Sequence, residues 1–65
     1  MTFPEMLSEA MGSMSQADLA DETGLRQATI SRYLSGKRKP SYEAQLALER
    51  RLPRLRELHR RQVAA

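Results

Sequence analysis

Cysteine is absent from the 65-residue chain, and histidine occurs once, at His59. Disulfides and cysteine-bound metals are therefore excluded, and one imidazole alone cannot form a histidine zinc site. We expect a reducing cytosol as the compartment. No nucleophile–base pair, phosphate-binding loop or carboxylate pair is arranged for chemistry, so no enzyme activity, cofactor or metal is predicted.

Long apolar runs and strand patterns are missing as well. No stretch approaches the roughly 20 apolar residues of a membrane span. The first ten residues carry Glu5 and Glu9 where a signal peptide would carry cations, so membrane insertion and secretion are not expected. Sustained period-two alternation and hairpin dipeptides are absent. These features predict an all-α fold in one domain, residues 1–65.

Charge is distributed unevenly along the chain. Residues 1–25 contain five carboxylates and no Lys or Arg, whereas residues 26–48 and 49–65 each have a net charge of +4. The isoelectric point is about 10.0. Positive charge gathered in the middle and at the C-terminus is typical of a protein that binds a polyanion. The alternative interpretation is a solvated surface with asymmetric charge.

Capping residues and apolar spacing divide the chain into four or five helices. Thr2 and Glu5 form a capping box at the first helix, and a glycine follows each of the first three. Pro53 either kinks the fourth helix or opens a fifth. The expected helices cover residues 2–12, 15–24, 26–36, 41–52 and 53–63.

Several features of residues 16–35, QADLADETGLRQATISRYLS, predict the same arrangement of two helices. Two helices that cross closely need a small residue at the crossing, an apolar anchor on each helix and a turn residue able to reach positive φ. Ala20, the pair Leu19 and Ile30, and Gly24 meet these needs at suitable separations. The stretch therefore predicts two helices that cross steeply around a tight turn.

A longer pattern extends from about residue 14 through 52. It comprises Gln16, Leu19-Ala20, the Gly24-Leu25 turn, Ile30-Ser31, Tyr33 and the exit SGKRKPS from Ser35 to Ser41. This pattern resembles helix-turn-helix proteins of the phage repressor and Cro type, also called XRE-like. Thr23 departs from the apolar residue usual in that family, and Arg26 from the usual Ser or Thr cap. The resemblance implies a compact lambda-repressor-like bundle of four or five helices that binds DNA and regulates transcription.

Base contacts are expected from the outward side of the third helix, because an α-helix fits the major groove of DNA. The candidates are Gln27, Ala28, Thr29, Ser31 and Arg32. Gln27 can pair with adenine and Arg32 with guanine, while Ala28 or the Thr29 methyl group can meet a thymine methyl. The alternative is that they are only exposed residues of a helix.

Contacts to the DNA backbone are expected from residues that flank this helix. Unpaired N–H groups at a helix N-terminus favour a phosphate oxygen, and a basic loop after the reading helix can reach either strand. The candidates are Gln16, Arg26, Lys37, Arg38, Lys39 and Ser41. Such contacts would position the protein without specifying sequence. A merely solvated loop is the alternative.

The basic C-terminal segment, residues 53–63, is open to several interpretations. Its arginines could touch flanking DNA, bind an acidic partner or only solubilise a helix. Leu46, Leu55 and Leu58 are predicted to form a dimer or partner surface, because Leu46 lies off the apolar stripe of its own helix. Helix-turn-helix modules commonly pair over half-sites about 34 Å apart, so we expect a homodimer on DNA.

The predicted function is therefore a sequence-specific, double-stranded DNA-binding regulator. We expect a Cro-like repressor that occupies a palindromic operator as a dimer in the cytoplasm of a bacterium or phage-infected cell. A DNA-binding antitoxin that also holds a protein partner through its C-terminal helix is a second possibility. A small helical protein-interaction module without sequence-specific DNA binding is the alternative from another class.

Overall fold

The computed structural model describes residues 1–64, so Ala65, the last residue of the expected domain, lies outside the described part. Five helices follow one another: α1 (Phe3–Met11), α2 (Gln16–Thr23), α3 (Gln27–Ser35), α4 (Tyr42–Arg51) and α5 (Pro53–Ala64). Residues 1–64 contain no strand, which confirms the all-α prediction. Pro53 opens a fifth helix. None of the helices described here is long and apolar enough to cross a bilayer.

Side-chain hydrogen bonds begin three of the helices where the sequence predicts. The backbone N–H of Thr2 donates to the Glu5 carboxylate at 3.0 Å, and the N–H of Glu5 donates to the Thr2 hydroxyl at 3.4 Å. The backbone N–H and then the hydroxyl of Thr2 hold the pKa of Glu5 below its ordinary value, because both stabilise the carboxylate. Ser15 and Ser41 each accept a backbone N–H three residues further on.

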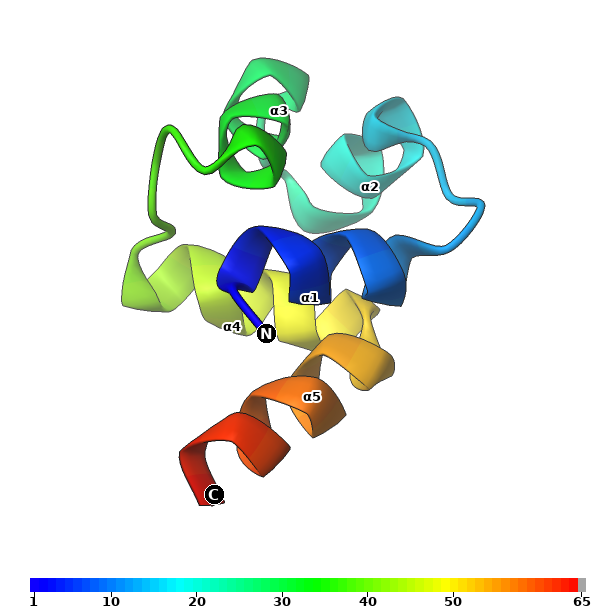
Figure 1. Cartoon of the computed structure of the whole chain (residues 1–65). Coiled ribbons are helices and arrows are strands. Elements are labelled where there is room, and N and C mark those ends of the chain that lie inside the picture. The colour runs from blue at the N-terminus through cyan, green and yellow to red at the C-terminus, as the bar shows by residue number, and fades with distance from the viewer. Residues whose placement is uncertain (65) are drawn as a thin grey trace.

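The helices stack so that α1 and α4 lie between the α2–α3 pair and α5 (Figure 1). The α3 helix packs on α1 and α2, while α4 packs on α2 and α5. The α5 helix also packs on α1. The outer side of α3 and the outer side of α5 therefore lie at opposite ends of the molecule.

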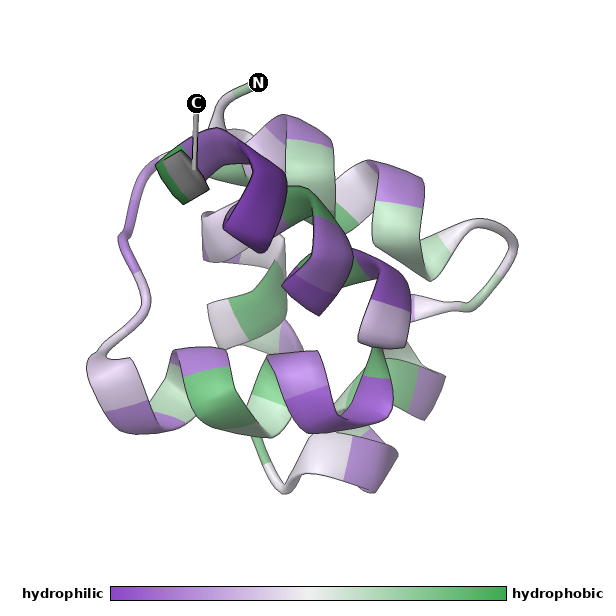
Figure 2. Ribbon diagram, turned by 90° about the horizontal axis from the view of Figure 1, so that it is seen from below, coloured by the Kyte–Doolittle hydropathy of each residue, from purple (hydrophilic) through white to green (hydrophobic). Residues whose placement is uncertain are grey.

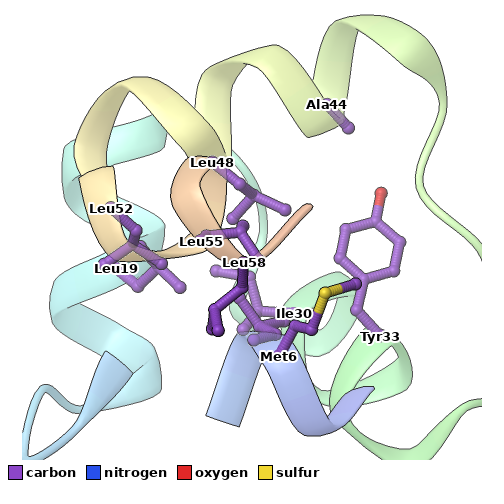
Figure 3. Packing of buried hydrophobic residues seen from close by; sticks show 10 residues of the cluster. Met6, Leu19, Ile30, Tyr33, Ala44, Leu48, Leu52, Leu55 and Leu58 are labelled. Atoms are coloured by element: carbon purple, nitrogen blue, oxygen red, sulfur yellow. The ribbon is translucent and has the colours of Figure 1, made fainter. Parts of the chain in front are cut away.

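One hydrophobic core joins all five helices (Figure 3). Its buried members are Met6, Leu7, Leu19, Ile30, Tyr33, Ala44, Leu48, Leu52, Leu55 and Leu58. Phe3 adds an edge-to-face contact with Tyr33, with ring centroids 6.3 Å apart and planes at 89°. This contact fixes the start of α1 against the second half of α3.

The positions of Leu55 and Leu58 correct the predicted partner surface. Their exposures are 1% and 7%, so both leucines belong to the core of their own chain and offer little surface to another. Leu52 leaves the helical conformation, with φ −125° and ψ 83°, and the chain takes a new direction before α5 begins. The apolar side of α5 therefore packs on α1 and α4. Leu46 remains half-buried at the surface.

Candidate nucleic-acid interface

A glycine in the left-handed conformation sets the angle between α2 and α3. Gly24 has φ 76°, and its N–H donates to the Ala20 carbonyl at 2.9 Å. Residues other than glycine rarely adopt this backbone conformation. Leu19 and Ile30 are fully buried at 0% exposure, and Ala20 is half-buried beside them. The predicted anchors, small residue and turn glycine are therefore confirmed.

The Thr23 hydroxyl closes the turn in a way that the sequence analysis missed. It donates to the Leu19 carbonyl at 2.7 Å and accepts the N–H of Leu25 at 3.3 Å. The hydroxyl thus connects the last turn of α2 to the residue after Gly24. A threonine in a last helical turn can bond the carbonyl four residues earlier, and this tendency was the available signal.

The first turn of α3 is formed without a side-chain cap. Arg26 is the N-cap residue, and its side chain makes no capping hydrogen bond. Its carbonyl accepts the N–H of Ile30 at 3.1 Å, which begins the helical pattern. The Arg26 side chain is exposed, so it extends into solvent beside the α3 N-terminus.

The outer side of α3 presents most of the predicted base-contact residues together. Gln27, Ala28, Ser31 and Arg32 are exposed, and Thr29 is half-buried at the edge of this side. The opposite side of α3 carries the buried core residues and faces the rest of the molecule (Figure 1). A short helix at the edge of a small domain, with an uncovered polar side, has the shape that enters a major groove.

The predicted backbone-contact residues lie on three different segments. Gln16 begins α2 and is half-buried, while Lys37, Arg38 and Lys39 are exposed directly after α3. Ser41 is exposed at the start of α4, but its hydroxyl already accepts a backbone N–H at 3.2 Å. A phosphate at this position would therefore meet the other backbone N–H groups of the α4 N-terminus.

Cations around α3 have no carboxylate partners in the part of the chain that the structure describes. Within residues 1–64, none of the following forms an ion pair: Arg26, Arg32, Lys37, Arg38 and Lys39. No described carboxylate therefore neutralises their charge, and a cluster of positive charge of this kind favours the approach of polyanions. The same part of the chain holds no group of three or more His, Asp or Glu residues placed to bind a metal ion.

Two polar contacts connect α4 to its neighbours. The Arg51 guanidinium donates through Nε to the backbone carbonyl of Glu22 at 2.8 Å, which ties the end of α4 to the end of α2. Gln45 donates to Glu49 at 2.9 Å, and His59 Nδ1 lies 3.3 Å from the same carboxylate. The Arg51–Glu22 and His59–Glu49 contacts hold α2 and α5 on α4, and they join residues whose sequence separation gives no local signal, whereas the Gln45–Glu49 bond lies within α4.

Two short helices around a tight turn, with a polar outer side and unpaired cations, define a helix-turn-helix DNA-binding module. The family model described as helix-turn-helix matches residues 6–59. The chain therefore belongs to this family, of the XRE or Cro/C1 type, and has a fold consistent with that of lambda repressor. Membership implies DNA binding and transcriptional regulation, and the family is non-enzymatic. No curated protein and no solved structure matches the chain.

Proposed function

We propose that the protein is a sequence-specific regulator that inserts α3 into the major groove of duplex DNA. Its base contacts come from Gln27, Ala28, Thr29, Ser31 and Arg32. The observation that carries this proposal is the exposed polar side of α3 among cations that form no ion pair within residues 1–64. Each good bidentate pair between a side chain and a base discriminates by about 1 to 3 kcal/mol.

Backbone contacts hold α3 in register on the duplex. They come from Gln16, Arg26, Lys37, Arg38, Lys39 and Ser41. The helix N-termini at Gln16 and Ser41 supply backbone N–H groups, and the loop after α3 supplies charge. These groups contribute affinity that falls as the salt concentration rises, because phosphate neutralisation releases counterions.

Repression follows from occupancy of an operator by two copies, one for each half of a palindrome. Large hydrophobic side chains exposed among the described residues are Met1, Tyr42 and Val63. These side chains do not supply a broad apolar surface, so pairing in free solution is weak and adjacent half-sites provide most of the pairing free energy. Binding in the cytoplasm of a bacterium or phage-infected cell would then exclude polymerase from an overlapping promoter.

Selection of bound sequences from random duplex DNA tests this function. A palindromic motif is expected, and Gln27→Ala should relax one position in each half-site. Lys39→Ala should weaken all sequences alike and reduce the salt slope by about 1. Arg60→Ala is the matched control, because it removes one exposed positive charge from α5 and should change neither property.

Absence of any enriched motif would contradict the proposal. If Lys39→Ala then weakened DNA binding through the charge it removes, and Gln27→Ala, which removes no charge, left it unchanged, the role of α3 would be non-specific. A protein-interaction module would become the better description of the chain.

A further inference from the structure

Two arginines of α5 are neutralised within the molecule. Arg54 lies 3.5 Å from Glu9 of α1 and 3.3 Å from Glu57. Arg61 pairs with the same Glu57 one turn away. These ion pairs neutralise the charge of both arginines, and the pair with Glu9 also joins α5 to α1.

Three other arginines form no such ion pair within the described residues. Arg50 of α4 and Arg56 and Arg60 of α5 are exposed, and none forms a hydrogen bond or ion pair through its side chain within residues 1–64. Arg56 and Arg60 are four residues apart, so they lie on the same side of α5, one turn from each other. The outer surface of α4 and α5 therefore carries a row of uncompensated positive charge.

An apolar side chain lies next to this row. Leu46, Glu49, Arg50 and Arg56 line a hollow of about 260 Å³ where α4 and α5 meet. Leu46 is half-buried there without joining the hydrophobic core. The Glu49 carboxylate is engaged by a hydrogen bond from a neighbouring glutamine at 2.9 Å and contacts a histidine at 3.3 Å. The hollow thus offers one apolar surface with two arginines at its rim.

The α5 part of this surface, with Arg56 and Arg60, lies away from the end of the molecule that carries α3, whereas Arg50 of α4 lies near the end of α2. Figure 1 places α5 on the far side of α1 and α4 from α3. Figure 2, seen from below, shows α5 nearest the viewer with mostly hydrophilic residues. A duplex held by α3 would therefore leave this side uncovered, and a ligand could occupy it at the same time.

We propose that this arginine face, Leu46, Arg50, Arg56 and Arg60, binds an acidic amphipathic helix of another protein. Carboxylates of that helix pair with the arginines, and one aliphatic side chain enters the hollow at Leu46. A second copy fits poorly, because two-fold pairing of this face would oppose the same arginines. Nucleic acid would satisfy the arginines but has no aliphatic side chain for Leu46. The proposal does not depend on sequence-specific DNA binding by α3.

The probe is an end-blocked, fluorescein-labelled peptide with leucine at every third or fourth position and glutamate or alanine elsewhere. Fluorescence anisotropy with the full chain should show saturable binding. The double variant Arg56→Glu with Arg60→Glu should weaken it at least about tenfold, since close charge pairs become repulsive. Leu46→Gln should weaken it severalfold without changing the charge. A peptide with glutamine in place of leucine should bind correspondingly less.

The matched control is Lys37→Glu with Lys39→Glu, which makes the same change in net charge at the α3 end. It should leave peptide binding within about twofold of the parent chain. Circular dichroism checks that each variant keeps its helices, and every substituted cation is exposed in the structure. Peptide binding should also persist when the protein is saturated with random-sequence duplex DNA at low salt.

Three results would overturn the proposal. The first is no saturable peptide binding at millimolar protein. The second is an equal loss of peptide binding in both double variants, which would indicate attraction by net charge alone. The third is displacement of the peptide by duplex DNA together with loss of DNA affinity in the Arg56/Arg60 variant, which would assign the face to nucleic acid.

Discussion

Replacement of Thr23 by valine removes the hydroxyl that closes the helix-turn-helix turn and keeps the branched shape of the side chain. The change deletes the 2.7 Å bond to the Leu19 carbonyl and the 3.3 Å bond from the Leu25 N–H. An intramolecular hydrogen bond contributes about 0.5–1.5 kcal/mol. The second bond is long and the site is only half-buried, so water recovers part of the loss. We expect a net destabilisation of about 1 kcal/mol.

For a domain of this size, 1 kcal/mol corresponds to a decrease of about 4–8 °C in melting temperature. Thermal unfolding followed by circular dichroism measures that decrease, and hydrogen exchange at the Leu25 amide locates it. Thr23→Ser is the control, because it keeps the hydroxyl and removes only a methyl group. Its Leu25 amide should exchange as slowly as in the parent chain. A valine variant that melts at or above the parent temperature would refute the reasoning, because apolar packing would then outweigh both hydrogen bonds.

Three further changes test the core, a cap and a contact between helices. Leu55→Ala should lower the free energy of unfolding by about 2–5 kcal/mol in urea titrations. The urea midpoint of the parent chain should not depend on protein concentration. A small loss of stability together with a concentration-dependent midpoint would instead indicate that Leu55 lies in a subunit interface. The hydrogen bonds from Thr2 lower the pKa of Glu5, so the stability that they provide is present above the ordinary glutamate pKa and is lost as the pH falls through the lowered value. Glu5→Gln should reduce this acid-dependent decrease in melting temperature, measured in a pH series of melts. Arg51→Ala should cost about 0.5–1 kcal/mol by releasing the Glu22 carbonyl, whereas the exposed and unpaired Arg60→Ala should stay within about 0.5 kcal/mol in the same urea titrations.

Helix ends were predictable because local interactions determine them. The Thr2 and Glu5 capping box, the Ser15 and Ser41 caps and the glycine after α2 act over three or four residues. Such signals are readable from the sequence regardless of the rest of the fold. The uncovered side of α3 was predictable for a related reason, because the periodicity of a helix separates inward from outward residues.

The predicted partner surface was wrong for Leu55 and Leu58 because an apolar stripe does not specify what covers it. The covering surface depends on the direction of α5, which changes at Leu52 and Pro53. That direction is set by packing against α1, more than 40 residues earlier in the chain. Base recognition by α3 stays a prediction, because the docking angle on DNA belongs to the complex.

The fold pairs some of the charges of this chain and leaves others unpaired, which the net charge of +3 does not show. The acidic first part supplies Glu9 to Arg54 and the Glu22 carbonyl to Arg51, so contacts with α1 and α2 engage two C-terminal arginines. The cations on α3 and in the loop after it receive no such partners among the described residues. Among residues 1–64, positive charge without a carboxylate partner is therefore concentrated at the α3 end and on the outer surface of α4 and α5. In the proposed complex with DNA, the polyanion meets the α3 end, and the outer side of α5 stays accessible.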